Sequence, residues 1–98
     1  MQNNFKTELY NDFVMDFFEE GTTDEILFSG LASEVGEVMQ ERTREVRKGE
    51  NKTKEILDEL SDVLWYVTVI AHKRGCSLKE LMSHNYTKLE LRRLGNKV

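Results

Sequence analysis

The sequence predicts an all-α fold: a four-helix bundle-like unit with a long antiparallel helical hairpin, assembling as a homo-oligomer. The 98 residues contain no proline and only six glycines, which is unusual for a sheet protein rich in turns. Helix start and stop signals recur along the chain, and apolar residues between them follow helical spacing. A chain of this length forms one domain, so we assign residues 1–98 to a single unit.

The first two predicted helices precede the predicted turn of the hairpin. The first covers residues 4–19 and ends at Gly21, with an apolar stripe at helical spacing made of Phe5, Leu9, Phe13 and Phe17. The second covers about residues 23–48. A capping box of Thr22 and Glu25 precedes it, and Gly49 follows its basic last turn.

The last two predicted helices complete the unit. The third begins at the capping residue Thr53 and runs to about residue 73, and the fourth opens with a capping box of Ser77 and Glu80 and ends at Gly95. The middle of the third helix, residues 63–71, is apolar on nearly every side, which is typical of a helix buried on nearly every side. A chain this short cannot supply that cover, so we expect this helix at the centre of a homo-oligomer.

Composition excludes several classes of partner. The net charge of −4 argues against a broad nucleic-acid-binding surface. No apolar run approaches the roughly 20 residues that span a bilayer, and the first residues lack the pattern of a signal peptide. A single cysteine excludes an intrachain disulfide, which fits a reducing compartment. We therefore expect a cytoplasmic protein with neither a nucleic acid nor a membrane as partner.

Acidic side chains gather on one edge of each hairpin helix. The spacing i, i+3, i+7 places each set in a narrow sector: Glu34, Glu37 and Glu41 on the second helix, and Glu59, Asp62 and Tyr66 on the third. Antiparallel packing would bring both edges to one seam, where carboxylates repel each other unless protons or a cation neutralise them. An all-oxygen ligand set favours Mg²⁺ or Mn²⁺, and Mg²⁺ binds phosphates, so a nucleotide or another polyphosphate is the expected substrate. A solvated helix face is the alternative interpretation.

The fourth helix carries a complementary set. Asn85, Lys88 and Arg92 share one sector, and Asn85 falls within the apolar stripe of that helix. The two cations could reach phosphate oxygens that a metal leaves uncovered. The alternative is a hydrogen-bonded core asparagine beside two solvated cations, and the residues alone favour that alternative.

These motifs, taken together, carry a family resemblance. Glu34-Val35-Gly36-Glu37 stands on one helix and Glu59-Leu60-Ser61-Asp62 on the next, followed by Asn85-x-x-Lys88-Leu89. Over about residues 25–93 the sequence resembles the MazG-like all-α nucleoside triphosphate pyrophosphohydrolases. The order and spacing of the motifs support the resemblance more than any one of them does.

The resemblance implies a site and a reaction. Its Mg²⁺ ligands and catalytic acids would be Glu34, Glu37, Glu59 and Asp62, and Mn²⁺ could substitute for Mg²⁺. The nucleotide site would be lined by Tyr66, Asn85, Lys88 and Arg92. The reaction would cleave a (deoxy)nucleoside triphosphate between the α and β phosphates, in a homodimer or a tetramer of two dimers with sites near subunit interfaces. Family analogy alone favours a house-cleaning role and deoxynucleotides, dCTP among them.

One departure and two alternatives stay open. Many family members have a further glutamate at the position of Ser33. Either fewer acids surround the metal here, or Glu41 or Glu55 contributes instead, so the number of metal ions is open. The first alternative function is that of a phosphoribosyl-ATP pyrophosphohydrolase, a relative with similar acidic helices. The second is a non-enzymatic helical interaction module whose acids are solvated.

Overall fold

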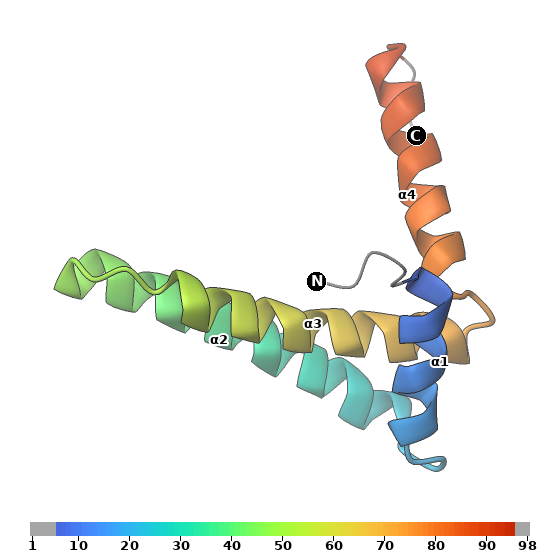
Figure 1. The fold of residues 1–98 in the computed structure, drawn as a ribbon, viewed down its shortest axis with the longest axis horizontal. Helices are drawn as coiled ribbons and strands as arrows, with labels where there is room; N and C mark the ends of the chain where they lie inside the picture. The colour runs from blue at the N-terminus through green and yellow to red at the C-terminus, as the bar shows by residue number, and fades with distance from the viewer. Residues whose placement is uncertain (1–5, 96–98) are drawn as a thin grey trace.

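The computed structural model describes residues 6–95, and the regular elements in that range are all helices (Figure 1). They are α1 (Thr7–Phe17), α2 (Asp24–Lys48), α3 (Thr53–Lys73) and α4 (Leu78–Arg93). The all-α prediction is therefore confirmed. Residues 4 and 5, which the sequence analysis places in the first helix, lie outside the described range. No helix in the described part of the chain combines the length and hydrophobicity needed to cross a membrane.

Helices α2 and α3 lie side by side and run in opposite directions (Figure 1). Gly49 ends α2 in the left-handed conformation, at φ 66°, and its N–H donates to the Glu45 carbonyl at 2.9 Å. Glycine adopts this conformation without the steric penalty that other residues incur, which allows the chain to reverse over residues 49–52. At the opposite end of the two helices, the Asp24 carboxylate forms ion pairs with Lys73 at 3.3 Å and Arg74 at 3.1 Å.

Two of the predicted capping residues are displaced. Thr23, not Thr22, caps α2, because its side-chain oxygen accepts from the N–H of Ile26 at 3.3 Å. The Thr22 hydroxyl instead donates to a carbonyl of the preceding turn at 2.8 Å. Thr53 is the first residue of α3, and the side chain of Asn51 accepts from its N–H at 2.8 Å. Each displacement is local, because neighbouring polar residues compete for the same free amides.

Helix α1 lies across the end of the α2–α3 pair and contributes to the core there (Figure 1). Val14 of α1, Leu27 of α2 and Val69 of α3 form the buried cluster, each at most 4% exposed. The stripe predicted for the first helix faces outward instead: Leu9, Phe13 and Phe17 are 57–67% exposed. The helix therefore has two apolar faces. The predicted stripe is the face that the single chain leaves exposed, and the face with Val14 is the buried one.

Helix α4 begins as predicted and then leaves the body of the molecule. The capping box is present: Ser77 Oγ accepts from the Glu80 N–H at 3.1 Å, and Glu80 Oε1 accepts from the Ser77 N–H at 2.9 Å. Leu78 is buried, but Met82 and Leu89 are 54% and 51% exposed. Within the described residues α4 packs against α1 and α3 but not α2, so the four helices of one chain do not close into a bundle (Figure 1).

The single chain leaves much of its apolar surface uncovered. Its radius of gyration is 16.1 Å, against about 13 Å for a compact domain of this size. Eight large apolar side chains of the hairpin are 42–68% exposed: Ile26, Phe28, Val35, Met39 and Val46 on α2, and Leu57, Leu60 and Leu64 on α3. Thr68 and Val69 are the buried residues of α3. One chain therefore does not enclose the apolar middle of this helix, which the sequence analysis expects to be buried only in a homo-oligomer.

A buried asparagine joins three of the helices. Asn11 of α1 is 5% exposed, and its Oδ1 accepts from the Leu78 N–H at the start of α4 at 2.7 Å. Its Nδ2 lies 3.2 Å from Nδ1 of His72 in the last turn of α3. The amide thus has a hydrogen-bond partner at both its nitrogen and its oxygen where α4 begins.

Replacing this amide should destabilise the fold. In Asn11→Ala the buried Leu78 N–H loses its acceptor, so the free energy of unfolding should fall by about 1–3 kcal/mol. Urea denaturation at fixed protein concentration would measure the change. Asp12→Ala, an exposed position on the same helix, is the matched control and should stay close to wild type. Equal stability of the two variants would contradict a structural role for the amide.

Candidate functional site

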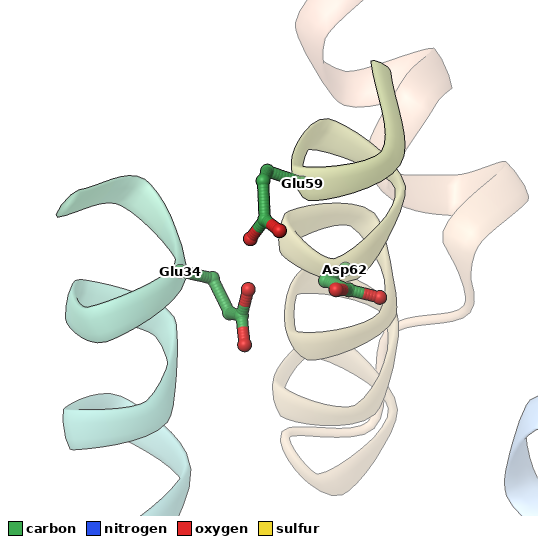
Figure 2. Close-up of side chains that lie close together, drawn as sticks. All are labelled: Glu34, Glu59 and Asp62. Carbon is green, nitrogen blue, oxygen red and sulfur yellow. The ribbon is translucent and has the colours of Figure 1, made fainter. Parts of the chain in front are cut away.

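Three carboxylates from facing helices meet in the middle of the hairpin. Glu34 comes from α2, and Glu59 and Asp62 come from α3; one oxygen of each lies within 4.8 Å of the other two. Figure 2 shows the Glu34 and Glu59 carboxylates directed toward each other between the helices, with Asp62 one turn further along α3. The i, i+3 spacing places Glu59 and Asp62 one turn apart on α3, where Glu59 extends toward α2 and the exposed Asp62 carboxylate extends across the helix (Figure 2).

These carboxylates lack the partners that buried oxygens normally have. Glu34 and Glu59 are half-buried, and the Oε2 atom of each is enclosed without a hydrogen-bond partner. Burying an unpaired charged oxygen is costly, so such atoms normally have a donor or a cation beside them. The residues therefore fit a hard divalent cation, which takes carboxylate oxygens as ligands and keeps water for its other positions.

Crowding raises the proton affinity of the cluster. The pKa of Glu59 rises to about 7, first because the Glu37 carboxylate lies beside it, then through burial, and also through the negative charge of Glu34. The pKa of Glu34 is raised as well, first by burial and then by the charges of Glu37 and Asp62. A bound cation would replace these protons, because it neutralises the same charges.

The other acids of the two edges lie in different surroundings. Glu37, the fourth predicted ligand, is exposed and stands outside the group of three, but close enough to raise the pKa of both Glu34 and Glu59. Glu41 pairs with Arg44 at 3.1 Å. Near the turn of the hairpin the pKa of Lys52 is raised, first by its ion-pair partner Glu50 and to a smaller extent by the charges of Glu55 and Glu41. Neither Glu41 nor Glu55 belongs to the three-carboxylate group among the described residues.

The basic residues of the fourth helix are not brought to the acids of their own chain. Lys88 is half-buried and Arg92 is exposed, on a helix that does not pack against α2 (Figure 1). Asn85 is exposed too, so the prediction that it lies in a core stripe is wrong for the single chain. Leu78 at the start of α4 is buried, whereas Met82, Tyr86 and Leu89 further along the helix are more than half exposed.

Tyr66 is positioned by a residue that the sequence analysis missed. Its ring packs edge-to-face on Trp65, with centroids 5.0 Å apart, and lies against Gly30 on α2. A glycine inside a helical pattern costs about 1 kcal/mol relative to alanine, so it commonly has a packing reason. That signal was present in the sequence at Gly30.

The geometry can bind a divalent cation between two helices and present it to the oxygens of a phosphorylated substrate. Comparison with protein families matches residues 22–94 to the MazG nucleotide pyrophosphohydrolase domain. Comparisons with curated proteins and with solved structures give no match. The matched range covers most of the chain and contains all four acids, which indicates nucleotide pyrophosphohydrolase activity. The chain therefore belongs to the MazG nucleotide pyrophosphohydrolase family.

Proposed function

We propose that this chain hydrolyses (deoxy)nucleoside triphosphates between the α and β phosphates in a Mg²⁺-dependent reaction that serves to remove unwanted nucleotides. The main support is the group of three carboxylates within 4.8 Å on facing helices, two of which have a buried oxygen without a partner. Membership of a nucleotide pyrophosphohydrolase family supports the reaction class. The products are a nucleoside monophosphate and pyrophosphate.

The acids have two tasks in this proposal. Glu34, Glu59 and Asp62, with Glu37 beside them, hold Mg²⁺, for which Mn²⁺ can substitute. When bound, the cation polarises the phosphoryl oxygens and lowers the pKa of water. The oxygen of a water forms a bond to the α phosphorus while the bond to the oxygen bridging to the β phosphorus breaks, and pyrophosphate leaves with that electron pair. A glutamate that is not fully occupied by metal accepts the proton of the water.

The exposed apolar surface supports a homo-oligomer, either a homodimer or a tetramer of two dimers. The outer face of α1 and the large apolar side chains of α2 and α3 remain 42–68% exposed in the single chain, and exposed apolar surface of this kind is typical of an interaction site. A second copy has the same apolar faces and would bury them in a self-complementary interface.

An oligomer would also explain why the basic residues of α4 lie away from the acidic cluster of their own chain. We propose that Tyr66, Asn85, Lys88 and Arg92 contact the nucleotide, and that α4 contributes its share to the site of a neighbouring subunit. The support is that α4 extends from the body of its own chain and does not pack against α2 (Figure 1). The charged side chains of Lys88 and Arg92 would bind the triphosphate oxygens that the metal ion leaves free.

The first test is pyrophosphate release from a panel of ribonucleoside and deoxynucleoside triphosphates, with phosphoribosyl-ATP included, with and without Mg²⁺. Wild type should release pyrophosphate from at least one nucleoside triphosphate in the presence of Mg²⁺. Glu59→Gln should lower kcat/KM by at least about 100-fold, since it removes a charged ligand of the cation.

Glu25→Gln is the matched control, because it removes an exposed carboxylate of α2 outside the cluster. It should retain wild-type activity. Turnover of phosphoribosyl-ATP without turnover of any nucleoside triphosphate would replace the proposed substrate. No release from any compound by a folded wild type would refute the reaction and favour an interaction module.

A second prediction concerns pH. In the metal-free protein Glu59 titrates at about 7 in the folded state, against 4.5 ordinarily, so the folded state binds more protons between these values. The free energy of unfolding of metal-free wild type should therefore fall as pH rises from about 5 to about 7. Glu59→Gln stays neutral and should lose less stability over the same range.

Thermal unfolding in EDTA and in Mn²⁺, across this pH range, would measure the effect. At about pH 8, Mn²⁺ should stabilise wild type and leave Glu59→Gln almost unchanged. A metal-free wild type whose stability is constant over the range would show that the cluster does not hold the extra proton.

A third prediction separates contributions within a chain from those between chains. Glu59→Gln and the double variant Lys88→Ala/Arg92→Ala should each be inactive as pure proteins. If α4 serves the neighbouring subunit, refolding them together in equal amounts should restore about a quarter of wild-type activity, because half of randomly formed dimers contain one intact site of two.

If each site uses only its own chain, both sites of a mixed dimer carry a defect and no activity returns. Mixed oligomers that form, as native mass spectrometry would show, but remain inactive would contradict the placement of α4 in the neighbouring site.

A further inference from the structure

A close contact between α2 and α3 lies one helical turn from the acidic cluster. The ring of Tyr66 occupies the space that a side chain at Gly30 would need. A Cβ added at Gly30 would lie 2.5 Å from Tyr66 Cζ and 2.6 Å from its hydroxyl oxygen, and closer still to Cε1. All three atoms belong to a rigid ring, so a methyl group fits at Gly30 only if the ring or a helix moves.

The position of this contact relates it to the cluster. Gly30 precedes Glu34 by four residues on α2, and Tyr66 follows Asp62 by four residues on α3. Because the helices are antiparallel, both intervals run in the same direction in space (Figure 1). The contact between Gly30 and Tyr66 therefore lies about 5–6 Å along the hairpin from the positions of Glu34 and Asp62.

The ring is held on its other side as well. Tyr66 is half-buried, packs on the core cluster and meets Trp65 edge-to-face, with an interplanar angle of 83°. It therefore cannot turn away from Gly30 without disturbing the core. A methyl group at Gly30 should be accommodated by separating the two helices, and the separation should extend to the neighbouring turn.

We infer that Gly30 is a positioning residue of the metal site: by admitting the Tyr66 ring against the α2 backbone, it sets the helix separation at which Glu34 faces Glu59 and Asp62. Metal–oxygen distances tolerate changes of only about 0.2 Å, and Mg²⁺ demands near-octahedral geometry. A helix displacement on the order of 1 Å therefore exceeds what the ligands can follow. The inference rests on the proposed metal site, but requires no particular substrate.

The test compares two additions of the same methyl group to the same helix. Gly30→Ala places it against Tyr66, whereas a Cβ at Gly36 has nothing within 4 Å of it in the chain. Both changes raise helix propensity equally. Mn²⁺ alone, titrated into each protein without nucleotide and followed by the loss of the free-ion electron paramagnetic resonance signal, gives the affinity. Light scattering and circular dichroism check that assembly and helix content are unchanged.

Gly30→Ala should weaken Mn²⁺ binding by about tenfold or more, as expected when groups that orient metal ligands are disturbed. Gly36→Ala should bind as wild type does. Gly30→Ala/Tyr66→Leu removes the ring that the methyl group meets and should bind more tightly than Gly30→Ala alone. Tyr66→Phe keeps the ring and should retain wild-type affinity, which separates a spacing role from one that needs the hydroxyl.

Each outcome is decisive. A folded Gly30→Ala that binds Mn²⁺ as tightly as wild type overturns the inference and leaves the proposed function intact. A wild type that binds no Mn²⁺ refutes the proposed metal site itself. If Gly30→Ala does not fold, the double variant decides: recovery of folding and of Mn²⁺ binding supports the contact, and failure to recover either shows that the defect does not arise from the Tyr66 ring.

Discussion

The close antiparallel contact of α2 and α3 is the constraint on which the rest of the structure depends. It opposes Glu34 to Glu59 and Asp62, so it creates the site and also its electrostatic cost. The contact is stabilised elsewhere, by the apolar cluster around Leu27 and Val69 and by ion pairs at the same end of the hairpin. A destabilising group of charges held by a core two to three helical turns away is the expected arrangement for a site whose repulsion is relieved when a cation binds.

The rest of the chain is organised around this hairpin, and its organisation is incomplete in one copy. A short chain has a high ratio of surface to volume, and here two long helices and a projecting α4 raise it further (Figure 1). The second apolar face of α1, and Met82 and Leu89 on α4, are more than half exposed in the single chain. In the oligomer that we propose, assembly would bury these residues and bring the basic residues of α4 to the acidic site of a neighbour, so that stability and activity would depend on the same interface.

The candidate site could be predicted in part. The i, i+3 spacing of acids beside apolar residues is a local property of each helix, and it correctly indicated that Glu34, Glu59 and Asp62 share one seam. The exposure of Glu37 and the ion pair of Glu41 depend on side chains that compete for the same space, which periodicity does not describe. The fit of Tyr66 onto Gly30 is a three-dimensional contact between residues far apart in the chain, so spacing alone could only mark the glycine as unusual.

By itself the sequence determined the helical class, the positions of the helices and several of their ends, including Gly49 and the Ser77–Glu80 box. These features depend on backbone amides and side chains within a few residues of one another, so local chemistry specifies them. Tertiary structure alone decided which of two apolar faces α1 buries, the direction of α4 and the exposure of Asn85. These features depend on the relative free energies of alternative contacts between distant segments. A helix with two apolar faces has no local preference for burying one face over the other.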